Sequence, residues 1–226
     1  MLSTTRTRTR RRAAAVPSRR RLAPVDRRRE LLQTAATVMT QQGVDAVQFA
    51  TIATAAGVTR QLVYRFFPSR QALVIEVLED FADEMTQRFG RNVARDLPSN
   101  MAEATSIFVA AACDTIAAKG AGPWQLLDAH GPEPEIARRA RAIQDRMIAP
   151  WHARIAAATG TNERQAKTVA RMLVAAGRAA LDLWCAGALT RDEAVRDAAR
   201  GMSAILAAFT VAGDRHARRG TPRSPA

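Results

Sequence analysis

Between residues 59 and 65 lie five side chains of the types that bind duplex DNA. Arg60 and Arg65 can each donate a paired hydrogen bond to guanine, and Gln61 can pair in the same way with adenine. The hydroxyls of Thr59 and Tyr64 can donate to phosphates, which fixes the register of a protein on DNA rather than its sequence preference. On a helix these positions form one polar face, so the segment predicts a DNA-reading helix.

Two short helices joined by a tight turn must hold these side chains. The pattern predicts a first helix over about 48–55, with Phe49 and Ile52 facing inward, and a second over about 60–66, capped by Thr59. Between them, Ala56-Gly57-Val58 supplies a sharp corner, because glycine can take the positive φ that such a corner needs. This arrangement is a helix-turn-helix, in which the second helix enters the major groove.

Apolar residues at helical spacing predict a helix on either side of this motif. The earlier helix begins at Asp26 and ends before Gly43. The later one follows Pro68-Ser69 and continues to about Phe89. Arg70 stands at its beginning, where a cation and free backbone N–H groups could bind a phosphate.

The rest of the chain is rich in alanine and shows few alternating patterns, which favours an all-α protein. A break near 96–100 separates two helical units. The later segments are expected to be a helix from Met101, a loop at 119–123, one or two helices over 124–158, helices at 162–186 and 191–212, and a disordered basic tail from residue 214. The expected domains are an Arg-rich arm (1–25), a helix-turn-helix domain (26–72), a helical bundle (73–213) and the tail (214–226).

The net charge of +13 is concentrated at one end of the chain. Residues 1–29 hold eleven arginines and one acid, Asp26, and so account for ten of these positive charges. Such an arm could lie along phosphates or in a minor groove, or it could add only non-specific affinity, and the sequence favours neither interpretation.

The helix-turn-helix segment resembles the DNA-binding domain of the TetR (tetracycline-repressor-type) family. The stretch from Gly43 to Leu73 reads GVDAVQFATIATAAGVTRQLVYRFFPSRQAL. The residues that carry the resemblance are Ile52-Ala53, Ala56-Gly57-Val58-Thr59, Tyr64, Phe67, Arg70 and Leu73. Gln48 stands where the family usually has a Ser or Thr cap, and Phe66 where it often has His or Tyr. The expected DNA-binding residues are Gln48, Thr59, Arg60, Gln61, Tyr64, Arg65 and Arg70.

The resemblance implies a ligand-responsive repressor that binds a pseudo-palindromic operator as a homodimer. It implies that the last two helices pair with their copies, through Ala176, Ala180, Leu183, Met202, Ile205 and Phe209; the alternative is that these faces serve only the subunit's own core. It also implies a pocket for a small apolar effector, walled by Phe108, Cys113, Trp124, Leu127, His130, Trp151, Met172 and Trp184. Taken singly, each of these residues is more often ordinary core than pocket wall.

Other functions fit the sequence less well. A sequence-tolerant architectural DNA-binding protein, driven by the Arg-rich arm, is the main alternative. A helical enzyme is disfavoured because there is no phosphate loop, nucleophile elbow or paired-carboxylate motif. Asp128, His130 and Glu133 lack metal-ligand spacing, so neither a metal nor a cofactor is expected. Without a secretory signal or a long uncharged apolar run, we expect a soluble cytoplasmic protein that spans no membrane.

Overall fold

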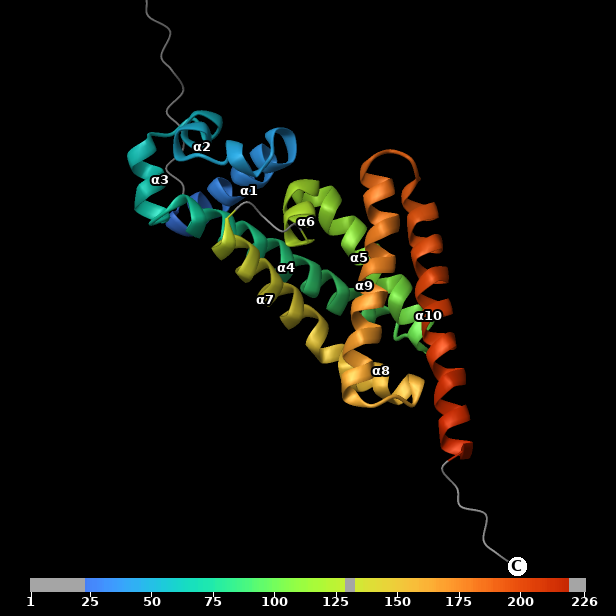
Figure 1. Cartoon of the computed structure of the whole chain (residues 1–226). Coiled ribbons are helices and arrows are strands. Elements are labelled where there is room, and N and C mark those ends of the chain that lie inside the picture. The colour runs from blue at the N-terminus through green and yellow to red at the C-terminus, as the bar shows by residue number, and fades with distance from the viewer. Residues whose placement is uncertain (1–22, 129–132, 220–226) are drawn as a thin grey trace, which may run out of the picture.

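The computed structural model describes residues 23–128 and 133–219, together with their side chains except those of 128 and 211–219. Throughout this part of the chain the regular elements are helices, and no strand occurs in it (Figure 1). The expected all-α class is confirmed. The Arg-rich segment 1–22, His130 and the last seven residues lie outside the described residues.

A small unit of three helices opens the described chain, as the sequence predicts. It consists of α1 (Pro24–Gln42), the 3-10 turn η1 (Val44–Ala46), α2 (Phe49–Ala56) and α3 (Arg60–Phe66). Gly57, between α2 and α3, is left-handed with φ 59° and ψ 42°, which is the conformation the turn requires. The Thr59 hydroxyl caps α3 by accepting from the N–H of Leu62 at 3.3 Å.

The remaining helices form a bundle on the long helix α4. They are α4 (Arg70–Arg95), α5 (Met101–Lys119), α6 (Ala121–Asp128), α7 (Pro134–Ile148), the 3-10 turn η2 (Ala149–Trp151), α8 (His152–Thr159), α9 (Glu163–Cys185) and α10 (Arg191–Arg219). The Ser69 hydroxyl caps α4 by accepting from the N–H of Ala72 at 3.1 Å. An Asn162–Gln165 capping box begins α9.

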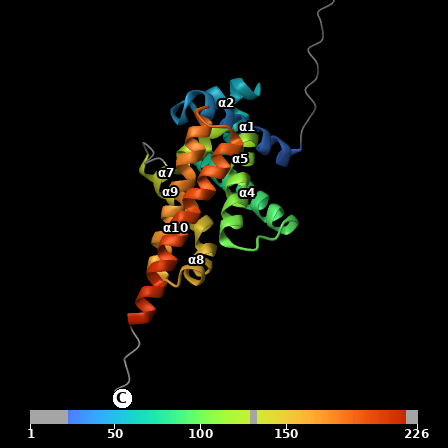
Figure 2. The same ribbon diagram turned by 90° about the vertical axis from the view of Figure 1, so that its right-hand side faces the viewer.

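The long helix α4 connects the first unit to the bundle. Figure 1 places α3 at one end of the molecule and the antiparallel pair α9–α10 at the other, with α4 and α7 running diagonally between them. The view turned by 90° shows α9 and α10 as neighbours along their length (Figure 2). One continuous apolar core extends from Leu31 in α1 through Phe81 in α4 to Leu173 in α9. A displacement in the bundle can therefore reach α3 through packed side chains.

Three of the expected boundaries are wrong. The expected loop at 119–123 is a one-residue break, because Gly120 turns the chain at φ 94° and α6 begins at once. The last helix continues through the expected tail to Arg219, where alanine and arginine favour helix and a single glycine is tolerated. Helix α1 begins two residues early, with Pro24 in its first turn, where a missing N–H costs nothing.

Helix α5 is long and apolar enough to cross a membrane by length and composition, with a mean hydropathy of 1.3. In the structure it packs against both α4 and α10. Val109, Ala112, Cys113 and Ile116 are buried there. Its apolar character therefore serves the core of the bundle.

Candidate nucleic-acid interface

The polar face of α3 is open to solvent. Thr59, Arg60, Gln61, Tyr64 and Arg65 are all exposed, whereas Val63 on the opposite side of the helix is fully buried. The five side chains that were expected to face outward are therefore on the exposed side of α3, and the buried Val63 is on its inner side. This geometry leaves five hydrogen-bonding side chains available to a ligand that approaches α3.

Tyr64 is held between two neighbours. Its ring meets the edge of Phe49, at the beginning of α2, with centroids 4.6 Å apart and planes at 80°. On the other side, Arg60 donates from Nη2 to the Tyr64 hydroxyl oxygen at 3.1 Å, and its guanidinium lies 5.5 Å from the ring centroid. Tyr64 can still donate its own hydroxyl proton, so the pair presents a guanidinium and a hydroxyl side by side.

Arg28 in α1 fixes the far end of α3. Its Nε and Nη2 atoms donate to the two carboxylate oxygens of Glu76, both at 2.5 Å. Its Nη1 donates to the Phe66 carbonyl at 2.8 Å, and its guanidinium stacks on Phe67 at 4.8 Å. The carbonyls of a last helical turn lack intrahelical partners, so Arg28 caps α3 while joining it to α4. The sequence places Arg28 in the first helix but does not reveal this role, because Glu76 and Phe66 lie far from it along the chain.

Arg70 points into the protein, which corrects the expectation that it binds a phosphate. Its Nε donates to the Val47 carbonyl at 2.9 Å and its Nη2 to the Val44 carbonyl at 2.7 Å. Its Nη1 forms an ion pair with Glu133, and its side chain is 19% exposed. With its donors occupied, Arg70 fastens the turn before α2 to the beginning of α4.

Gln48 lies at the beginning of α2. It occupies the N-cap position of α2, but its side chain makes no capping hydrogen bond. The Nε2 atom donates instead to the Asp45 carbonyl at 3.1 Å. Its side chain is exposed, so contact with DNA stays a prediction.

Further contacts join the bundle to the helix-turn-helix unit. The Gly122 N–H, in the first turn of α6, donates to the Thr40 hydroxyl in α1 at 3.0 Å. A Cβ on Gly122 would lie 2.6 Å from the backbone nitrogen of Thr40, so only glycine permits this approach. The second contact is made by Glu133, which accepts from Gln71 at 2.8 Å in addition to pairing with Arg70.

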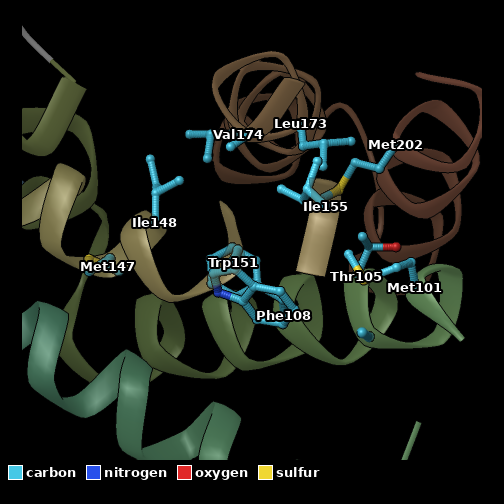
Figure 3. A pocket seen from close by; sticks show the side chains of 12 residues that line it. Met101, Thr105, Phe108, Met147, Ile148, Trp151, Ile155, Leu173, Val174 and Met202 are labelled. Carbon is cyan, nitrogen blue, oxygen red and sulfur yellow. The ribbon is translucent and has the colours of Figure 1, made fainter. Parts of the chain in front are cut away.

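Two small apolar cavities lie inside the bundle. Each has a volume of about 50 Å³, and they share Phe108, Met147, Ile148, Leu173, Val174 and Met202 as walls. Figure 3 shows the first cavity, with the rings of Phe108 and Trp151 below Ile155 and Leu173. A space of this size holds a few water molecules at most.

The expected pocket residues divide into four groups. Phe108 lines both cavities, Trp151 lines the first, and Trp124 and Leu127 line the second. Cys113 is fully buried and Trp184 partly buried, and neither lines these two cavities. Met172 is wrong as a pocket residue: it is 43% exposed on the outer face of α9. His130 lies outside the described residues.

The expected dimer residues are also divided by the structure. Leu183 is 49% exposed on the outer face of α9, and Ala176, Ile205 and Phe209 are partly buried. Ala180 and Met202 are wrong as interface residues, because both are buried within the subunit. A Cβ on Gly177 would lie 3.6 Å from the Met202 sulfur, which shows how closely Met202 packs between the helices.

The cysteines offer little reactivity. Burial raises the pKa of the Cys113 thiol from 9.0 to about 11, and burial also raises the pKa of Cys185. Both groups are therefore held as neutral thiols near pH 7. Among the residues that the structure describes, no three His, Cys, Asp or Glu side chains gather as a metal site would require.

Residues 31–77 match the family model described as "Bacterial regulatory proteins, tetR family". Two curated relatives are named HTH-type transcriptional repressor KstR2. The protein from Mycolicibacterium smegmatis is 36% identical over 87 residues, which is 38% of this chain and 42% of the relative. The protein from Rhodococcus jostii is 37% identical over 73 residues, which is 32% of this chain and 36% of the relative. The chain thus aligns with about two fifths of each relative's length.

Solved structures resemble the chain over much more of its length. A TetR-like transcriptional regulator from Rhodococcus sp. RHA1 matches 83% of this chain and 99% of its own, with TM-score 0.67 and 18% identity. A tetR-family regulator from Streptomyces coelicolor matches 90% of this chain and 93% of its own, with TM-score 0.64 and 20% identity. At these identities the likeness concerns the fold, in which a helix-turn-helix unit precedes a helical bundle.

Proposed function

We propose that this chain, whose residues 31–77 match the tetR-family model, is a TetR-family regulator that represses transcription by binding a DNA operator. Helix α3 enters the major groove, where Arg60 and Gln61 contact base edges. Thr59, Tyr64 and Arg65 contact phosphates and set the register. The observation that carries this proposal is the exposed row of donors on a helix that Arg28 and Val63 hold in place.

The regulator acts as a homodimer through the outer faces of α9 and α10. Met172, Ala175, Ala179 and Leu183 form an exposed stripe at helical spacing on α9. The neighbouring face of α10 exposes three small residues, Ala204, Ala207 and Ala208. Small residues let helices approach closely, and the larger Met172 and Leu183 can fill the seam. Two copies of α3 then read half-sites about 34–36 Å apart, so the operator is pseudo-palindromic.

An effector bound in the bundle releases the DNA. The cavities lie between α5, α7 and α9, and α7 is connected through Glu133 to the helix-turn-helix unit. An effector that prefers a wider spacing of the reading helices shifts the population away from the DNA-binding state, with a coupling free energy of about 1–3 kcal/mol. In this scheme residues 26–72 read DNA and 73–213 bind effector and partner, with α4 shared between them. We assign no catalytic step to the protein, and it acts in the cytoplasm, where its operator lies.

Selection from a pool of random duplexes at physiological salt tests this function. The intact protein is expected to enrich a two-fold-symmetric site, and Arg60→Ala combined with Tyr64→Ala is expected to abolish the enrichment. Gln41→Ala, an exposed substitution in α1, serves as the matched control. Retention of DNA without an enriched sequence, unaffected by the double substitution, would instead support the architectural role of the Arg-rich arm.

A further inference from the structure

One end of the apolar cavities carries polar groups. The second cavity is lined by apolar side chains except for Gln144 in α7 and Arg178 in α9. The same two residues, with Ile148 and Val174, also line an outer groove of about 370 Å³ between these helices. Gln144 and Arg178 therefore stand at the junction between a hydrophobic interior and the surface.

Arg178 is largely buried. Its side chain is 16% exposed, and its guanidinium lies 5.1 Å from the ring centroid of Trp124. It forms an ion pair with Asp182 at 3.3 Å and donates to the carbonyls of Trp124 and Gln125 at 3.4 and 3.5 Å. Arginine stays charged in any environment, so these groups already stabilise a positive charge beside the cavity.

The counter-ion of Arg178 has other partners. Asp182 accepts a hydrogen bond from the indole nitrogen of Trp124 at 3.0 Å, and its side chain is 46% exposed. Asp182 can thus keep its hydrogen bonds to Trp124 and to water if the guanidinium of Arg178 turns toward a second anion.

We propose that the effector is an elongated apolar molecule with a single carboxylate at one end. Arg178 and the carboxamide of Gln144 bind the carboxylate, and the hydrocarbon body occupies the two cavities, which merge around it. This inference rests on the proposed function, since it specifies the effector that releases DNA. The hydrogen-bond donors of Arg178 and Gln144 at one end, and the apolar walls of the cavities, together define the class of ligand.

Binding of such a molecule must widen the bundle. Two cavities of about 50 Å³ cannot hold a chain of ten or more carbons, so α7 and α9 must separate where Met147, Ile148 and Val174 meet. Because Glu133 begins α7, this movement strains the contact of Glu133 with Arg70 and Gln71.

A matched pair of probes tests the inference. Titration of the full chain with dodecanoate and with 1-dodecanol, below their aggregation limits, is followed by tryptophan fluorescence, since Trp124 and Trp151 line the cavities. We expect dodecanoate to bind at least tenfold more tightly than the alcohol. Arg178→Met should remove this preference and change the affinity for the alcohol less than threefold.

Arg171→Met is the control, because Arg171 lines the outer groove on the same helix but pairs with Asp145 at 2.6 Å and is 61% exposed. It should keep the preference for the acid. If Arg178→Met does not fold, Arg178→Lys and Gln144→Met should each reduce the preference in a folded protein. Equal affinity for the two probes, no binding of dodecanoate, or a preference that survives in Arg178→Met would overturn the inference.

Binding to the selected operator, measured by fluorescence anisotropy, separates this inference from the proposed function. A protein that binds its operator but ignores dodecanoate contradicts the ligand class alone. A protein that binds dodecanoate but reads no DNA sequence contradicts the proposed function.

Discussion

Glu133, the residue immediately before α7, forms an ion pair with Arg70, the first residue of α4. The same carboxylate accepts from Gln71 at 2.8 Å, and Arg70 continues to the carbonyls of Val44 and Val47. One carboxylate therefore connects α7, which lines the apolar cavities, to the turn that precedes α2. Because α7 also lines the cavities, this connection is a direct route from bundle to DNA-binding unit.

Replacing Glu133 by glutamine should weaken the contact between the beginning of α7 and the beginning of α4. The ion pair is partly buried, with side chains 19% and 28% exposed, so its loss should lower the free energy of unfolding by about 1–2 kcal/mol. Urea denaturation measures this. Glu135→Gln removes a more exposed pair with Arg138 and should cost less than about 0.5 kcal/mol. Equal costs for the two variants would show that the Glu133 contact adds little.

Removing the guanidinium of Arg28 should weaken DNA binding as well as folding. Arg28→Met loses the cap on α3 and leaves Glu76 without this partner, at a cost of about 1–3 kcal/mol in unfolding free energy. Because the end of α3 is then free to shift, operator affinity should fall at least tenfold at a temperature where the variant is fully folded. Arg28→Lys should recover part of the stability but not the two-point contact with Glu76. An unchanged operator affinity in the folded Met variant would contradict the positioning role.

Two glycine substitutions should have opposite effects. In Gly122→Ala the new Cβ would lie 2.6–2.9 Å from the backbone of Met39 and Thr40, so α6 must move away from α1 at a cost of about 1–3 kcal/mol. In Gly90→Ala nothing lies within 4 Å of the new Cβ, and alanine is the better helix former, so α4 should gain about 0.5–1 kcal/mol. Thermal denaturation of both variants checks this. A melting temperature for Gly122→Ala at or above that of the parent would refute the close packing of α6 on α1.

Alkaline pH should destabilise the protein through Cys113. The pKa of its thiol is raised to about 11 in the folded state by burial, so the folded state holds the proton more tightly than the unfolded state. The free energy of unfolding should therefore fall as pH rises from about 9 to 11, and the fall should be less steep in Cys113→Ala. Urea denaturation across this range gives the slopes. Rapid reaction of native Cys113 with a thiol reagent at pH 8 would contradict the burial on which this prediction depends.

The parts of the fold that local rules govern could be predicted from sequence. The left-handed Gly57 and the cap at Thr59 depend only on nearby residues, and the structure has both. Partners far apart in sequence could not be predicted. Arg28 pairs with Glu76 and Arg70 with Glu133. The position of Arg70 at the beginning of a helix suggested phosphate binding, whereas the fold turns its guanidinium inward.

In the last two helices, α9 and α10, the faces that pack within the subunit could not be predicted from the sequence either. Both are apolar on more than one side, so periodicity locates the helices but not which side meets the subunit's own core. The sequence analysis therefore assigned Ala180 and Met202 to the interface and Met172 to the pocket. In the structure α10 packs on α5 and α9 and so buries Met202, Ala180 is also buried, and Met172 is exposed.

The central claim is that α3 reads a DNA sequence, and the ratio of specific to non-specific affinity tests it most directly. Fluorescence anisotropy on the selected operator and on a scrambled duplex, at one salt concentration, gives this ratio for the intact chain, for Arg60→Ala with Tyr64→Ala, and for a chain lacking residues 1–22. We predict a ratio of at least about 10³ for the intact chain, a collapse toward one in the double variant, and a largely preserved ratio in the truncated chain. A ratio near one in the intact chain, with affinity lost only on truncation, would contradict the account.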